Sequence, residues 1–155
     1  MTTTPNTLKV GSAAAAIVAA AMAFIRPWEG YVPHPYHDGT GHDAVCRGHT
    51  VPYSQRHYDT SECAAFFVQD VWSAYKDVDA AIHVPLTVSQ WIALVDFQFN
   101  TGAIWRSSVR KQANSGRPAS VWCHSMLQWV YAGHRRIQGL VNRRAAEVKL
   151  CLTGD

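Results

Sequence analysis

The sequence predicts an α+β fold in which a small strand-and-turn lobe is followed by a larger helical lobe. Two observations favour this class. Residues 26–58 contain four prolines and no helical period, which indicates strands and turns. From Asp59 onward, apolar side chains recur at helical spacing. A strand-rich segment followed by a helix-rich segment is typical of α+β domains.

Length and composition agree with one folded domain. The chain has 155 residues, of which 48% are hydrophobic and 16% are charged, and this composition excludes a disordered or fibrous chain. The formal net charge is +3, from 14 Lys+Arg against 11 Asp+Glu. Such a small excess does not by itself indicate nucleic-acid binding, so we expect no nucleic-acid partner. We also expect a monomer.

The first expected element is a helix over the uncharged, alanine-rich residues 10–25. It would be about 24 Å long, shorter than the roughly 30 Å hydrocarbon core of a membrane. Three interpretations remain: a cleaved signal peptide with its site at residues 21–23, an uncleaved anchor that exports the chain and later leaves the bilayer, or a helix of a soluble domain. The run has no polar residue between Ser12 and Arg26, and this disfavours the third interpretation.

The strand-and-turn lobe comes next. Residues 27–36 are predicted to form a short helix or turn. The segment from there to Thr50 is predicted to form short strands separated by turns, because glycines recur in it at positions 39, 41 and 48.

Four helices are predicted in the second lobe. Asp59 and Glu62 form a capping-box pattern before the first, and residues 87–90 (TVSQ) begin the second, which ends near Gly102. Pro118 suits the first turn of a third helix, over residues 118–129. Residues 140–150 form the fourth.

Four cysteines, Cys46, Cys63, Cys123 and Cys151, are spread along the chain. No two have CxxC spacing, which excludes a zinc ribbon and a thioredoxin-type motif. In an exported protein they would form two disulfides, and in a cytosolic one four thiols. The spacing does not select one of the three pairings.

Two carboxylates in the first lobe are the candidate catalytic residues. Glu29 follows Trp28, and an aromatic neighbour excludes water and favours the protonated form that a general acid needs. Asp38 lies in a polar turn, where a carboxylate stays ionised. One protonated and one ionised carboxyl group are the pair that glycoside hydrolysis uses. The alternative is that Glu29 forms a cap or ion pair and that Asp38 is a turn residue.

The same segment also contains residue types that bind metals. His34, His37, Asp38, His42 and Asp43 supply nitrogen and oxygen donors within ten residues. No predicted helix or strand holds them at a fixed spacing. We therefore expect a polar turn, with no metal and no cofactor.

The motifs of the first lobe resemble those of the phage-type lysozymes of glycoside hydrolase family 24. They comprise Glu29-Gly30, Tyr36-x-Asp38, Gly41 and residues 45–50 (VCRGHT). Further similar segments are residues 97–102 (FQFNTG), 129–133 (WVYAG) and 139–147 (GLVNRRAAE). The resemblance implies a lysozyme-like fold and cleavage of the β-1,4 bond between N-acetylmuramic acid and N-acetylglucosamine in peptidoglycan, for lysis of the host cell.

The resemblance also implies roles for individual residues. Glu29 matches the acid that protonates the glycosidic oxygen, and Asp38 matches the base or charge stabiliser of an inverting reaction. Arg143 matches an arginine that holds the acid in place; the alternative is a surface charge. His49 is expected to form a structural ion pair with Asp70.

One position departs from the family pattern. The threonine that helps to hold the attacking water is replaced by Ala44, which cannot bind water. Either Thr40, His42 or Asp43 takes over, or the site is impaired. A non-catalytic peptidoglycan-binding protein is therefore the alternative to an active enzyme.

The N-terminal run and the cysteine positions resemble those of the signal-anchor-release endolysins of lambdoid phages. This similarity favours export without cleavage. It implies that residues 1–26 form a signal-anchor-release segment and that residues 27–155 form the catalytic domain. Residues 10–25 would associate transiently with the host inner membrane before the enzyme enters the periplasm.

Overall fold

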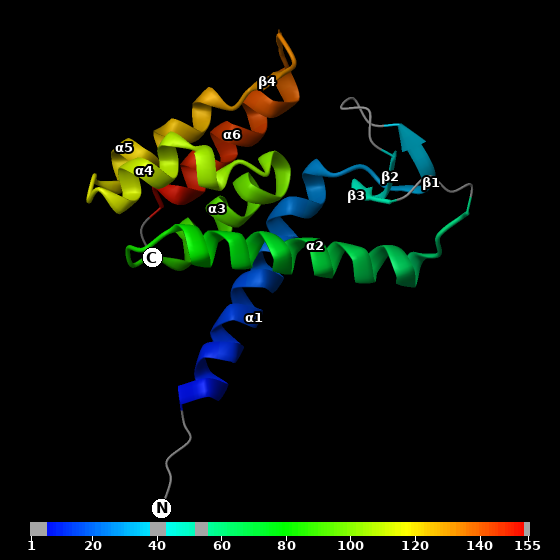
Figure 1. Cartoon of the computed structure of the whole chain (residues 1–155), viewed down its shortest axis with the longest axis horizontal. Helices are drawn as coiled ribbons and strands as arrows, with labels where there is room; N and C mark the ends of the chain where they lie inside the picture. Colours follow the sequence, from blue (N-terminus) through cyan, green and yellow to red (C-terminus); the bar gives the residue numbers. More distant parts are fainter. Residues whose placement is uncertain (1–5, 38–42, 52–55, 154–155) are drawn as a thin grey trace, which may run out of the picture.

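The structure, a computed structural model, describes residues 6–37, 43–51 and 56–153, with the side chains of residues 6–10 left out. The first elements are α1 (Asn6–Ile25), the 3₁₀ helix η1 (Arg26–Trp28), and strands β1 (Val32–His37), β2 (Asp43–Cys46) and β3 (His49–Thr50). The helical lobe then contains α2 (Thr60–Ala81), α3 (Val88–Thr101), η2 (Ile104–Arg106), α4 (Ser108–Asn114), α5 (Ala119–Trp122), η3 (His124–Gln128), β4 (Tyr131–Ala132), β5 (Arg135–Arg136) and α6 (Gln138–Cys151). The α+β class is confirmed (Figure 1).

The first lobe is an antiparallel sheet in the order β1-β2-β3. The predicted helix or turn over residues 27–36 is only partly right, because η1 is helical but residues from Val32 onward form a strand. Two prolines fit this strand because β1 lies at the edge of the sheet, where a missing N–H donor is tolerated. In the register, Ala44 lies opposite Tyr36 on one side and Thr50 on the other.

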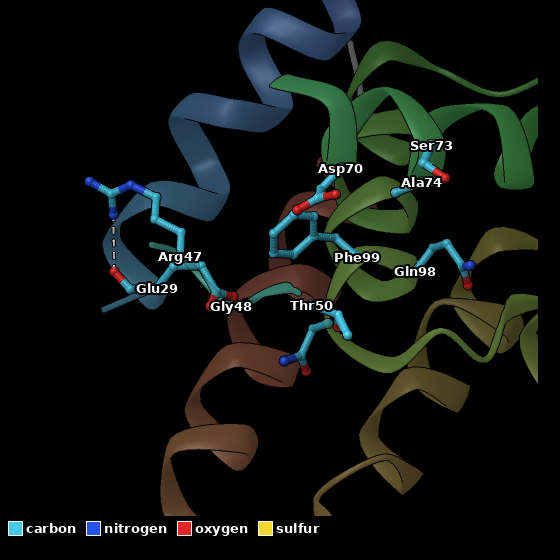
Figure 2. A pocket seen from close by; sticks show the side chains of 10 residues that line it. Glu29, Arg47, Gly48, Thr50, Asp70, Ser73, Ala74, Gln98 and Phe99 are labelled. Atoms are coloured by element: carbon cyan, nitrogen blue, oxygen red, sulfur yellow. Dashed lines mark hydrogen bonds between the residues drawn. The ribbon is translucent and has the colours of Figure 1, made fainter. Parts of the chain in front are cut away.

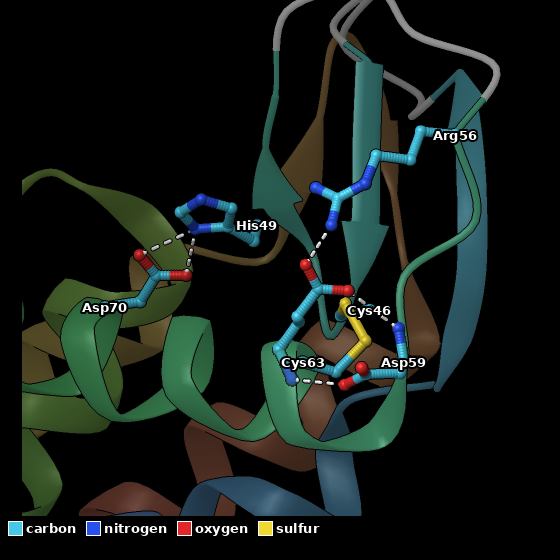
Figure 3. Close-up of a disulfide and its surroundings, with 7 residues drawn as sticks. Cys46, His49, Arg56, Asp59, Cys63 and Asp70 are labelled. Atoms are coloured by element: carbon cyan, nitrogen blue, oxygen red, sulfur yellow. Dashed lines mark hydrogen bonds and ion pairs between the residues drawn. A yellow bond between two sulfur atoms is a disulfide. The ribbon is translucent and has the colours of Figure 1, made fainter.

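The two predicted capping boxes are present. Asp59 accepts a hydrogen bond from the backbone N–H of Glu62, whose carboxylate accepts one from the N–H of Asp59 (Figure 3). Thr87 and Gln90 exchange the same pair of bonds at the start of α3. Gly102 ends α3 with a left-handed φ of 59°, a conformation that glycine adopts without steric cost.

The predicted third helix is shorter than expected. Pro118 is the N-cap rather than a residue of the first turn, and α5 ends at Trp122. The chain continues as the 3₁₀ helix η3, because the N–H groups of Met126 and Trp129 bond to carbonyls three residues back. Helix α4 was missed, since seven residues are too few for an apolar period.

Helix α1 packs against α2 and α3 along one face of its C-terminal half. Val18, Ala21 and Ile25 on this face are buried in the main hydrophobic core. Ala15, Ala19 and Ala23 on the opposite face are exposed. In Figure 1 the N-terminal half of α1 extends away from both lobes.

Both disulfides expected for an exported chain are formed, and the structure assigns their pairing. Cys46–Cys63 links the end of β2 to the first turn of α2 (Figure 3), and Cys123–Cys151 links the α5–η3 junction to the end of α6. No free cysteine remains among the four, all of which lie in the described part of the chain. The first disulfide holds the sheet lobe against α2.

Candidate active site

Glu29 lies where the chain leaves η1 and enters the sheet lobe. Pro27 suits the first turn of η1, and Glu29 caps its end in an extended conformation. The Glu29 side chain is 18% exposed. Its Oε1 accepts a hydrogen bond from Arg143 Nη1 of α6 at 2.6 Å. Two residues that are 114 positions apart are thus brought into contact.

Arg143 is held in turn by Asp96 of α3. Arg143 Nη2 lies 2.5 Å from Asp96 Oδ1, and its Nε donates to both Asp96 oxygens at 3.1 and 3.2 Å. Asp96 is completely buried. It was not predicted as a site residue, although a charge within the apolar run of α3 was a usable signal, because a buried charge requires a partner.

The charge state of Arg143 follows from its neighbours. Burial acts to lower the pKa of Arg143, but its hydrogen bonds and charge interactions with Asp96 and Glu29 outweigh burial and raise that pKa. The guanidinium therefore stays positively charged between the carboxyl groups of Asp96 and Glu29. It can donate one N–H to Glu29 while Asp96 fixes its orientation.

A second buried pair lies behind the site on α6. Arg144 and Glu147 are both fully buried, 2.5 Å apart, and Arg144 also donates to Asn100 Oδ1 at 2.9 Å. Burial raises the pKa of Glu147 well above its ordinary value and lowers the pKa of Arg144. Arg144 thereby holds Asn100, which lines the cleft between the two lobes.

Glu29 lies at a cleft of about 400 Å³ between the two lobes. This volume falls in the range typical of small-ligand sites. The sheet lobe supplies Glu29, Arg47, Gly48 and Thr50, and the helices α2 and α3 supply Asp70, Ser73, Ala74, Gln98, Phe99 and Asn100 (Figure 2). The lining is mostly polar.

The expected pair between His49 and Asp70 is present at one side of the cleft. His49 Nδ1 lies 2.8 Å from Asp70 Oδ2 (Figure 3). The imidazole stacks on Phe66 with ring centroids 4.1 Å apart. Burial raises the pKa of Asp70, and His49 offsets part of that increase. The pair joins the sheet to α2 and supports the cleft wall.

Three predicted site residues, Asp38, Thr40 and His42, lie outside the described residues. Asp43 begins β2, and its Oδ1 is 2.7 Å from His37 Nδ1. Ala44 is buried, with 1% exposure. Within residues 6–37, 43–51 and 56–153, no group of three or more His, Cys, Asp or Glu side chains is arranged to hold a metal ion.

Comparison with known proteins agrees with this architecture. The phage lysozyme family model matches residues 26–147. The SAR-endolysin of Escherichia phage Mu is 39% identical over 119 residues (75% of this chain, 69% of the relative), and that of Pseudomonas phage phiKMV is 34% identical over 143 residues (88% and 89%). The muramidase domain of SpmX from Asticaccaulis excentricus superposes with a TM-score of 0.78 at 27% identity, over 87% of this chain and 96% of that domain.

Two lobes that enclose a polar cleft, with a glutamate held by a buried arginine, define a lysozyme-like glycoside hydrolase. The chain belongs to the phage lysozyme family. It is a muramidase whose substrate is peptidoglycan, and the non-catalytic alternative is not favoured.

Proposed function

We propose that Glu29 is the general acid of this endolysin and that Arg143 positions it. The observation that carries the proposal is the 2.6 Å contact between Arg143 Nη1 and Glu29 Oε1 beside the cleft. Protonated Glu29 donates its proton to the glycosidic oxygen as the bond from that oxygen to the anomeric carbon breaks. Arg143 orients the carboxyl group, and it stabilises the carboxylate that remains after the proton has left.

The second carboxylate is Asp38, by its place in the motif. It accepts a proton from the attacking water, whose oxygen adds to the anomeric carbon with inversion. The test of both roles is the release of reducing ends from purified peptidoglycan. Glu29→Gln and Asp38→Asn are each expected to reduce this release severely while parent protein is active.

The position of the missing threonine supports a second proposal, that a neighbour holds the attacking water. We expect one of Thr40→Ala, His42→Ala and Asp43→Ala to lower the rate about tenfold, the effect of losing one hydrogen bond to a charged or reacting group. Ala44→Thr should change the rate little, because a neighbouring residue already holds the water and because position 44 is buried. A many-fold gain in reducing-end release by Ala44→Thr would show an impaired enzyme instead.

We also propose that residues 1–26 form a signal-anchor-release segment before a catalytic domain over residues 27–155, which acts as a monomer. Among the described residues, one helix is long and apolar enough to cross a membrane, over Gly11–Trp28 with a mean hydropathy of 1.3. Two relatives are named SAR-endolysins. The buried face of α1 gives the helix an alternative to lipid, since Val18, Ala21 and Ile25 pack into the core. In this proposal the chain associates transiently with the inner membrane and then acts in the periplasm.

Leucines on the exposed face of α1 test the release. Ala15→Leu, Ala19→Leu and Ala23→Leu together should retain the chain in the membrane fraction and delay lysis, because each added CH₂ contributes about 0.8 kcal/mol in lipid. These positions are exposed, so the packing of α1 on α2 and α3 is preserved. The detergent-extracted triple variant should cleave peptidoglycan at the parent rate. If it fractionates and lyses as the parent does, release from the membrane is not the controlling step.

A further inference from the structure

Arg47 connects the turn after β2 to the backbone of the proposed acid. It follows Cys46, whose φ of 62° is left-handed and turns the chain toward η1. Arg47 Nη1 donates to the backbone oxygen of Glu29 at 3.1 Å (Figure 2). The same nitrogen lies 3.5 Å from the backbone oxygen of Arg26. One guanidinium thus contacts both ends of η1.

The guanidinium of Arg47 is itself held in place. It lies 5.8 Å from the ring centroids of both Tyr31 and Phe67, a distance at which cation–π attraction acts. The preceding residue, Cys46, is tied to Cys63 by a disulfide. The side chain lines the cleft and also a smaller cavity of about 210 Å³ beside α1 and α2. A planar donor fixed on several sides can hold a backbone segment at a defined position.

We propose that Arg47 is a positioning residue for the general acid, an inference that rests on the proposed role of Glu29. Arg143 fixes the carboxyl end of the Glu29 side chain, and Arg47 fixes the main chain from which that side chain projects. A general acid must lie within about 2.6–3.2 Å of the oxygen it protonates, so both ends of the side chain must be held. Arg47 lies within the motif of residues 45–50, but the resemblance implied no role for it.

The contact with Arg26 adds a second consequence. Arg26 is the first residue after α1, so the same guanidinium links the end of that helix to the acid. The same guanidinium therefore holds the backbone at both ends of η1, the short segment that joins α1 to Glu29.

The test compares Arg47→Met, Arg47→Lys and the matched control Arg56→Met on soluble peptidoglycan glycan fragments. Arg56 also lies over an aromatic ring, that of Tyr58, and pairs with Glu62, but it does not line the cleft. Arg47→Met should lower kcat on the order of 10- to 100-fold, the effect of misplacing a catalytic group by about 1 Å, with KM within about twofold of the parent. Arg47→Lys keeps the charge and one donor and should recover part of kcat. Arg56→Met should keep the parent kcat.

Each outcome decides the proposal. The proposal is supported if kcat falls from the parent to Arg47→Lys, and falls again to Arg47→Met, while KM stays constant. A parent-like kcat for folded Arg47→Met overturns it. A raised KM at constant kcat also overturns it, because Arg47 would then bind sugar. If Arg47→Met does not fold, Arg47→Lys decides by the same criterion of reduced or parent-like kcat at constant KM. Glu29→Gln is measured in parallel: full activity there refutes the acid role, whereas an inactive Glu29→Gln with a parent-like Arg47→Met refutes only the role of Arg47.

Discussion

Replacing Glu29 by glutamine is expected to lower the rate of peptidoglycan cleavage by about 10²–10⁴-fold, the usual contribution of general acid catalysis. The amide has nearly the same shape as the acid, and its oxygen can still accept the hydrogen bond from Arg143 Nη1. It has no acidic proton to give to the leaving oxygen. Arg143 retains its contacts with Asp96, so the fold of the variant should be preserved.

The measurement is the release of reducing ends, with turbidity loss of outer-membrane-permeabilised Gram-negative cells as a second assay. Glu62→Gln is the matched control, because a glutamine at the third position of a helix also completes a capping box. We expect the control to keep the parent rate. If Glu29→Gln released reducing ends as fast as the parent, the acid would have to be another group, and the contact with Arg143 would be structural only.

Local signals predicted most of the fold. The capping boxes at Asp59 and Thr87, and Gly102 at the end of α3, depend on residues three or four positions apart, so a single pass along the sequence detects them. The strand β1 was predicted incorrectly because its two prolines are acceptable only at the edge of a sheet. Whether a strand lies at an edge depends on the pairing of distant segments, which local patterns do not contain.

The sequence indicated some residues of the candidate site but not all the residues that hold them in place. The resemblance pointed to Glu29 and Arg143, and the structure places them in contact across 114 positions. Asp96 and Arg47 were not identified, because their partners lie 47 and 18 positions away and no local pattern relates them. The pairing of the cysteines was open for the same reason: two disulfides that close loops of 17 and 28 positions depend on the packing of separate elements.

Asp96→Ala is expected to be the most destabilising change at the site. It would leave the guanidinium of Arg143 buried, with its hydrogen bond to Glu29 but without the contacts to Asp96. Breaking a buried ion pair by removing one partner costs about 3–5 kcal/mol, a large share of the roughly 5–15 kcal/mol by which a native domain is stable. Urea unfolding measures this change as a lower midpoint at an unchanged slope.

Asp96→Asn separates charge from shape, since its amide oxygen still accepts from Arg143 but its negative charge is gone. We expect a loss of about 1–3 kcal/mol, because the amide oxygen can keep the two contacts made by Oδ1, while the contact from Arg143 Nε to Oδ2 and the negative charge are lost. Asp79→Ala on the exposed face of α2 is the control and should lie within about 0.5 kcal/mol of the parent. Reducing-end release should fall in both Asp96 variants at temperatures where they are folded, because Arg143 then no longer has a fixed orientation toward Glu29. An Asp96→Ala variant as stable and as active as the parent would mean that α6 alone orients Arg143.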